Sequence, residues 1–167
     1  SGNLGLIYFT SWKERMSLEQ INKAFPKLIP GLLSCSFIGF LLVRSELHGP
    51  VAIGSHGIYY LKNDRVEGIN PLAAFGTLAA ERLRKESSFT NVADIVVNSF
   101  YNPETGEIAA FEELVGSHGG LGGDQSLGFL MYPSELDPGR DSIVGPEQLH
   151  RVMERWVPID RQRTRFW

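Results

Sequence analysis

The run Phe37-Ile38-Gly39-Phe40-Leu41-Leu42-Val43 is the feature that most constrains the fold of this chain. It is apolar without interruption, so no alternate position is left for a side chain that faces water. A strand of this kind is buried on both faces, which is typical of strands in parallel sheets with helices on either side. The chain therefore has to cover both faces of at least one strand.

The segment before this run predicts a strand followed by helices. Residues 4–10 are apolar and β-prone, and Ser17-Leu18-Glu19-Gln20 has the pattern of a capping box, with Ser17 as the N-cap. Apolar residues at helical spacing follow, but Pro26 and Pro30 interrupt them, which predicts two short helices or a kinked one. A strand, a helical crossover and a second strand predict a βαβ unit with a right-handed parallel pair of strands.

The middle of the chain predicts a hairpin and a helix. Residues 50–53 and 57–61 flank the turn Gly54-Ser55-His56 and are typical of a hairpin, with an edge strand expected at residues 66–68. Asn70-Pro71 then has the pattern of a helix start, with Asn70 as N-cap and proline in the first turn. We expect this helix to run to about Glu86.

The second half predicts further strands and a last helix. Residues 93–101 are strongly β-prone, residues 102–106 form a turn, and residues 107–111 are expected to return as a strand. Residues 126–132 are a further expected strand. A helix is expected from Gly145, with one apolar stripe formed by Leu149, Val152, Met153 and Trp156.

The predicted fold class is α+β, and α/β in part: a βαβ unit, a hairpin and a mixed sheet flanked by helices. We expect one domain over residues 1–157 and a basic tail at 158–167.

The composition of the chain bears on its partners, its cysteine chemistry and its location. The formal net charge of −3 gives no electrostatic signal for nucleic acid, so no nucleic-acid partner is expected. The single Cys35 excludes an internal disulfide, and its apolar neighbours predict a buried, unreactive thiol. His48 and His56 adjoin glycines in turns and are expected at the surface. No apolar stretch approaches the ~20 residues that span a bilayer, so the segment itself is expected to be soluble.

The loop at residues 114–124 is the strongest candidate for a functional site. It places His118 among five glycines, directly after Glu112 and Glu113. Glycine permits positive φ and a close approach of the backbone to a ligand, and a neutral imidazole is the commonest metal ligand. Composition alone leaves open a flexible loop in which the histidine is incidental. Glu112, Glu113 and Asp124 are weaker candidates; in a strand the two glutamates would point to opposite faces.

Val115-Gly116-Ser117-His118-Gly119-Gly120, followed by an apolar run that ends at Pro133, resembles the C-terminal metal-ligand motif of the alkaline phosphatase superfamily. The closest branch is the type I phosphodiesterase/nucleotide pyrophosphatase group. The string from Asp94 to Gly120 resembles bacterial membrane-associated proteins that carry N-terminal membrane helices before an alkaline-phosphatase-like domain. The resemblance extends from about Asn3 to Pro133.

This resemblance implies a site with two divalent metals, zinc or manganese, and a Thr or Ser nucleophile. It implies that His118 is the late histidine ligand and that Gly119 and Gly120 lie near the phosphate. The family's nucleophile, its early aspartate and its Asp-His-Gly motif have no match in the sequence, and we interpret the similar Gly54-Ser55-His56-Gly57 as coincidence. The chain therefore resembles the C-terminal portion of a hydrolase domain, a fragment of an alkaline-phosphatase-like fold that is expected to be inactive alone.

The implied partner is the remainder of a longer, membrane-associated chain, namely its N-terminal hydrolase segment and its membrane helices. The abrupt strand-like start and the lack of a signal peptide agree with a piece of a longer protein. Two alternatives stay open: a non-catalytic binding or regulatory cap module, and a free-standing metal- or phosphate-binding protein in which Glu112, Glu113 or Asp124 joins His118. The strands at Ile95 and Leu127 are expected at a sheet edge, which would permit a homodimer through strand pairing.

Overall fold

A computed structural model of the protein describes residues 2–113, 116, 118–140 and 142–157. The chain separates into two compact units, Ser1–Leu127 and Gly128–Trp167, and each is described by itself. The single domain expected over residues 1–157 stays a prediction. The basic tail expected at residues 158–167 lies outside the described residues.

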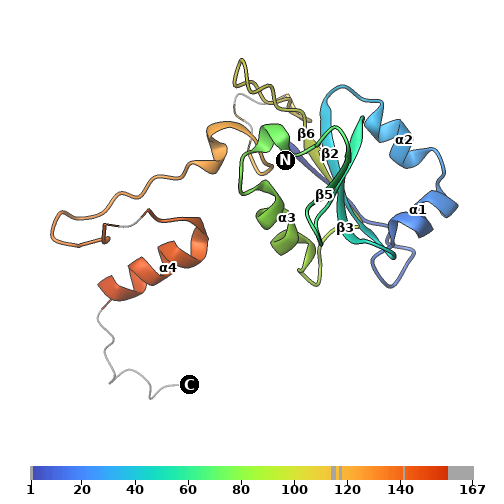
Figure 1. The fold of residues 1–167 in the computed structure, drawn as a ribbon. Coiled ribbons are helices and arrows are strands. Elements are labelled where there is room, and N and C mark those ends of the chain that lie inside the picture. The colour runs from blue at the N-terminus through green and yellow to red at the C-terminus, as the bar shows by residue number, and fades with distance from the viewer. Residues whose placement is uncertain (1, 114–115, 117, 141, 158–167) are drawn as a thin grey trace. The chain divides into compact units, whose positions relative to one another are not determined.

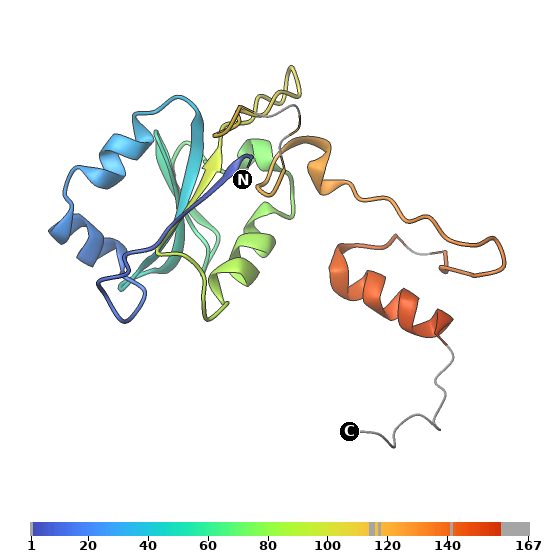
Figure 2. The same ribbon diagram turned by 180° about the vertical axis from the view of Figure 1, so that it is seen from behind.

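The larger unit is built on a six-stranded sheet in the order β1-β6-β2-β3-β4-β5, and each neighbouring pair is antiparallel. The strands are β1 (Leu4–Ile7), β2 (Ile38–Ser45), β3 (Gly49–Gly54), β4 (Gly57–Tyr60), β5 (Arg65–Gly68) and β6 (Ile95–Ser99). One face is covered by α1 (Leu18–Ala24) and α2 (Leu28–Leu33), and the other by the 3-10 turn η1 (Ala73–Phe75) and α3 (Ala79–Ser87) (Figures 1 and 2). The α+β class is confirmed, but the sheet is antiparallel and not mixed.

Strand β2 is covered on both faces, as its unbroken apolar run predicted. Phe40 and Leu42 belong to the core below η1 and α3, whereas Leu41 and Val43 belong to the core below α1 and α2. All four side chains are fully buried. The inference of a parallel sheet from this run was wrong, because an apolar run reports how many faces are covered and not the direction of the neighbouring strands.

The predicted parallel pair of β1 and β2 is also wrong. Each of these strands pairs antiparallel with β6, so they run in the same direction but β6 lies between them. All five residues of β6 are buried, which corrects the expectation that Ile95 lies at a sheet edge. A strand that is apolar on both faces gains most from a central position, because both faces are then removed from water.

Several local patterns predicted their elements correctly. Ser17 and Gln20 form the expected capping box at the start of α1, and α1 and α2 are the two short helices expected around Pro26. Strands β3 and β4 form the predicted hairpin, and β5 is the predicted edge strand. These elements are fixed by residues close in the sequence, so the sequence pattern suffices to find them.

The predicted helix from Asn70 is interrupted. The predicted N-cap is wrong: the Asn70 side chain accepts a hydrogen bond from the Leu72 N–H at 2.9 Å, but this bond closes a turn, and the first helical turn begins at Ala73 with Leu72 as its N-cap. This first turn is the short η1, and Gly76 then adopts a φ of +88°, which lies outside the helical range. Glycine adopts this conformation at no steric cost, so the chain turns here and α3 begins only at Ala79.

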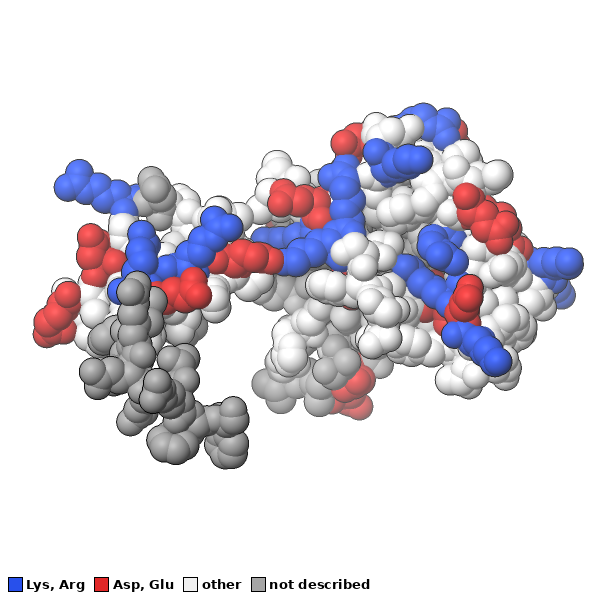
Figure 3. All heavy atoms as spheres, turned by 90° about the horizontal axis from the view of Figure 1, so that it is seen from below, with Lys and Arg blue, Asp and Glu red and all other residues white. Residues whose placement is uncertain are grey.

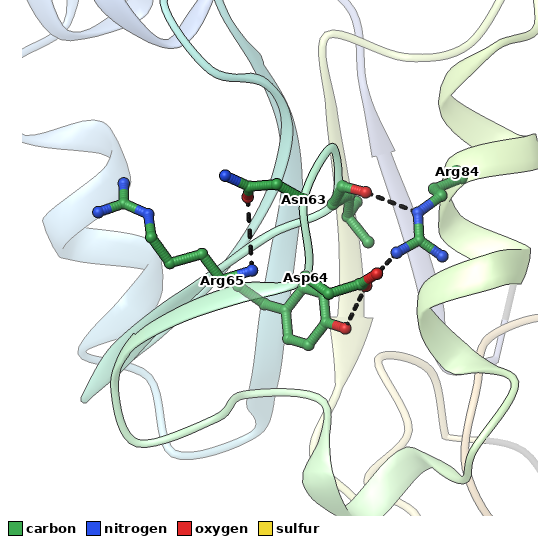
Figure 4. A network of polar contacts seen from close by, with 6 residues as sticks. Asn63, Asp64, Arg65 and Arg84 are labelled. Carbon is green, nitrogen blue, oxygen red and sulfur yellow. Dashed lines mark hydrogen bonds and ion pairs between the residues drawn. The ribbon is translucent and has the colours of Figure 1, made fainter.

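Helix α3 is tied to the turn between β4 and β5. Its Arg84 donates to the Leu61 carbonyl oxygen at 2.6 Å and pairs with the Asp64 carboxylate (Figure 4). Tyr59 donates to the same carboxylate at 2.6 Å. This hydrogen bond lowers the pKa of Asp64, as does the nearby Arg84 charge, and it raises the pKa of the Tyr59 hydroxyl. The contacts fix α3 across the strands β4 and β5.

Other expectations from the sequence need correction, in the larger unit and at the start of the smaller one. Cys35 is exposed and not buried, because it follows the end of α2 in a turn. The return strand expected at residues 107–111 is reduced to a single bridge between Tyr101 and Ile108. Residues 126–132 form no strand. Ser126 is the last residue of the 3-10 turn η2 (Gly123–Ser126), and Phe129 is 90 % exposed. His48 and His56 are exposed, as expected.

The smaller unit contains the predicted helix α4 (Gly145–Trp156). Its Trp156 indole N–H donates to the Asp137 carbonyl oxygen at 2.8 Å, and the Trp156 ring packs against Tyr132 at 5.3 Å between centroids. Val152 is buried, whereas Met153 on the same stripe is half exposed.

Among the described residues of the whole chain, no helix has the length and apolar character needed to cross a membrane.

Glu19 fastens the β2–β3 turn to α1. Its carboxylate accepts hydrogen bonds from the Ser45 hydroxyl at 2.7 Å and from the Glu46 N–H at 2.9 Å. Burial alone would raise the pKa of Glu19, but the hydrogen bonds from Glu46 and Ser45 outweigh it and lower the pKa. The folded protein therefore stabilises the charged form of this side chain.

We expect Glu19→Gln to lower the free energy of unfolding by about 1 kcal/mol at pH 7, since the partly exposed carboxylate is screened by solvent. A pKa that is lowered in the folded state stabilises above the ordinary pKa of 4.5, and this stabilisation is lost as the pH falls through the folded value. Urea unfolding at pH 7 and pH 3 should therefore show the difference from wild type shrink in acid. Glu104→Gln, in the exposed turn at residues 102–106, is the control and should change little at either pH.

Candidate functional site

Two buried asparagines lie side by side at one end of the sheet. Asn98 belongs to β6 and is 2 % exposed, and Asn3 directly precedes β1 and is fully buried. The register of the two strands pairs Leu4 with Asn98, and the Ser99 N–H donates to the Asn3 carbonyl oxygen at 3.0 Å. The pairing of β1 with β6 therefore brings together two carboxamides that are far apart in the sequence.

These carboxamides hold the glycine-rich loop at residues 114–124, of which the structure describes Gly116 and residues 118–124. We call it the glycine loop. The Gly120 N–H donates to Asn3 Oδ1 at 2.9 Å, and the Leu121 N–H donates to Asn98 Oδ1 at 2.7 Å. The Leu121 carbonyl oxygen accepts from Asn98 Nδ2 at 3.1 Å and from Asn3 Nδ2 at 3.4 Å. The Asn98 side chain thus pairs with the Leu121 backbone as a neighbouring strand would. We call Asn3, Asn98, Gly120 and Leu121 the asparagine clamp.

Glycine is required at two positions of this loop. A Cβ at residue 120 would lie 2.6 Å from Asn98 Oδ1 and 2.9 Å from the Asn3 backbone oxygen, which is closer than real Cβ contacts allow. Gly122 has a φ of +112°, and a Cβ there would meet the Tyr101 ring at 3.0 Å. These two glycines let the backbone approach the sheet, whereas the sequence analysis expected the glycines to let it approach a ligand.

His118 lies two residues before the asparagine clamp and is exposed. Gly119 is exposed as well and has a φ of +110°, which glycine adopts readily. Residues 114, 115 and 117 of the same loop lie outside the described residues. The imidazole is thus presented to solvent close to a fixed point of the backbone. Its assignment as a metal ligand stays a prediction.

The weaker candidates are dispersed along the chain. Glu112 and Glu113 lie in irregular backbone and are exposed, so the strand alternation assumed for them does not apply. Asp124 lies exposed in η2. Within the part of the chain that the structure describes, no group of three or more His, Cys, Asp or Glu side chains is arranged to hold a metal ion.

A small cavity of about 130 Å³ opens beside the glycine loop. Its floor is formed by apolar side chains of three strands, Leu4, Phe40 and Val96, and its walls by Arg82, Leu83 and Glu86 of α3 and by Gly119, Gly120 and Leu121 of the loop. On the face of the larger unit drawn in Figure 3, Lys and Arg side chains lie among Asp and Glu side chains, so no patch of one sign covers that face. What the cavity attracts therefore depends on the charged side chains that line it, Arg82 and Glu86.

Sequence reasoning missed the asparagine clamp. Asn98 carries a signal, because it is a polar residue inside the apolar run Ile95-Val96-Val97 and a buried carboxamide needs hydrogen-bond partners. Asn3 carries no comparable signal, since its burial depends on the late strand β6. Arg82 carries no sequence signal that sets it apart from the neighbouring charged residues of α3, yet it is half-buried and lines the cavity beside the loop.

Comparison of the chain with protein-family models, with curated protein sequences and with solved structures found no match.

We expect Gly120→Ala to lower the free energy of unfolding by about 2–4 kcal/mol, because the new Cβ clashes with both asparagines and breaks the hydrogen bonds of the clamp. Gly116→Ala is the matched control, since a Cβ there meets nothing within 4 Å. It should change the stability by less than about 0.5 kcal/mol. Urea unfolding measures both; equal effects of the two substitutions would show that the loop is not held at residue 120.

Proposed function

We propose that this chain is the C-terminal segment of a metal-dependent phosphodiesterase or phosphatase with an alkaline-phosphatase-like fold, in which His118 is one ligand of a divalent metal, zinc or manganese. The observation that carries the proposal is the position of His118, which is exposed and lies two residues from the asparagine clamp. A ligand must be held within about 0.5 Å of its working position, and a loop fastened to a buried strand supports that requirement.

The donor set of the chain suits part of such a site. An imidazole is a common ligand of zinc and related metals, but a catalytic zinc takes three protein ligands. No described group of side chains supplies three, so the other ligands belong to a different part of the longer protein. When bound, the metal pair of such a site stabilises the attacking and leaving oxygens of an in-line displacement. The partner of this chain is then the remainder of its own protein, with the N-terminal hydrolase segment and the membrane helices.

The loop has a second role in this proposal. Gly120 donates its N–H to Asn3, so this group is already used and any backbone donor to a phosphate oxygen comes from Gly119. Gly119 is exposed and has no Cβ, which lets an anion approach the backbone closely. The chain therefore supplies an imidazole and a backbone surface, and the nucleophile comes from outside it.

In the longer protein that contains this segment, we expect His118→Ala to lower the zinc- or manganese-dependent hydrolysis of bis-p-nitrophenyl phosphate at least about 100-fold and to weaken metal binding, because a metal loses a ligand. His56→Ala is a matched control, since His56 lies in the same tetrapeptide Gly-Ser-His-Gly but in the exposed turn of the β3–β4 hairpin. It should leave both quantities unchanged.

Activity and metal binding that survive His118→Ala would contradict the assignment of this residue. A wild-type protein that hydrolyses no phosphate ester and binds neither metal would favour the other interpretation of the chain, a non-catalytic binding or regulatory cap module.

A further inference from the structure

A hollow continues from the glycine loop along one face of β1. The cavity beside the loop is followed by a second one of about 410 Å³, and Glu86 lines both. Leu4 lines the first cavity and Leu6 and Tyr8 line the second, and alternate residues of an extended chain share one face. We call the two cavities together the β1 groove; residues 89–93 complete its far end.

The far end of the β1 groove is apolar and open to solvent. Leu6 is 49 % exposed, Tyr8 51 % and Phe89 52 %, and all three line the second cavity. The Tyr8 hydroxyl donates to the Asn91 carbonyl oxygen at 3.2 Å, which fixes its ring beside the hollow. Three large apolar side chains around one depression favour binding of an apolar group there.

The near end of the groove carries a cation, the Arg82 guanidinium. Among the residues that the structure describes, the half-buried Arg82 side chain makes no ion pair and no hydrogen bond, whereas Arg84 is bound to Asp64 and Leu61. Arg82 faces the same cavity as Gly119 and Gly120. A guanidinium presents several donors in a fixed geometry that matches a phosphate, so the near end is complementary to that anion.

Glu86 separates the two ends. Glu86 lines both cavities, but Arg82 lines only the first, so the negative charge of Glu86 disfavours a second anionic group in the second cavity, among whose lining residues there is no cation. The groove is therefore suited to a ligand that is anionic at the glycine loop and uncharged along Leu6, Tyr8 and Phe89.

We infer that the β1 groove binds phosphate esters of an apolar alcohol, with the phosphate between Arg82 and the glycine loop and the alkyl chain over Leu6, Tyr8 and Phe89. The inference rests on the proposed function, because it names the substrate class of the same site. It concerns binding and not hydrolysis, so it is testable on this chain without metal.

The test is a calorimetric titration of the chain with n-octyl phosphate, n-butyl phosphate and inorganic phosphate, each below any micellar concentration. The octyl ester should bind at least tenfold more tightly than the butyl ester, because each buried methylene adds up to about fourfold in affinity. Inorganic phosphate should bind most weakly. An octyl ester that binds no more tightly than the butyl ester overturns the inference.

Three variants locate the binding. Arg82→Gln should weaken both esters about tenfold, since a charge-assisted hydrogen bond is lost. Phe89→Ser should reduce the advantage of the octyl ester over the butyl ester and leave the butyl ester unchanged. Lys85→Gln is the control, because it removes one positive charge from the same helix at a residue that lines neither cavity. If Lys85→Gln weakens binding as much as Arg82→Gln, the effect is one of net charge and the groove is not the site.

The titrations, taken together with the hydrolysis assay of His118→Ala, separate the two proposals. Tight binding of the octyl ester that depends on Arg82 and Phe89, together with hydrolysis unaffected by His118→Ala, supports the groove and contradicts the metal site. Hydrolysis that depends on His118 without any preference for the octyl ester supports the metal site and overturns the groove.

Discussion

Asn3 and Asn98 exchange hydrogen bonds with the backbone of Gly120 and Leu121, and both asparagines are buried. A buried carboxamide without partners would cost about 1–3 kcal/mol for each unsatisfied group. The loop satisfies these groups, and in return the sheet fixes the loop at one point. Strand β1, strand β6 and the glycine loop are thereby coupled, and the position of His118 depends on all three.

The coupling exists because β6 enters the sheet between β1 and β2. Asn98 is brought beside Asn3 by the pairing of this late strand with β1. The two core clusters require the same arrangement, since Val96 packs below α3 and Ile95 and Val97 pack below α1 and α2. The loop is therefore a consequence of the completed sheet and not an independent motif, which is why its glycines cannot be understood from the loop sequence alone.

Local patterns predicted much of the fold, and long-range pairings account for the errors. The capping box at Ser17, the break at Pro26 and the β3–β4 hairpin depend on neighbours in sequence and are confirmed. Residues 127–131 are mostly apolar and have the composition of a buried strand, yet they form no strand, and Phe129 and Met131 are nearly fully exposed. Composition reports what a segment would gain by burial, but the available partners decide whether it is buried. For the site, the motif pointed to His118 and two glycines, whereas Asn3 and Asn98 act through contacts that span more than twenty residues of sequence.

Amide hydrogen exchange at Gly120 and Leu121 tests the central claim that buried asparagines hold the glycine loop. Backbone N–H groups that donate to buried acceptors exchange slowly, because exchange requires local opening. We expect slow exchange at both residues in the wild type and fast exchange at Leu121 in Asn98→Ala, with the β3–β4 hairpin unchanged as the internal reference. If Gly120 and Leu121 exchange in the wild type as fast as the exposed residues 127–129, the loop is not held by the sheet and the account is wrong.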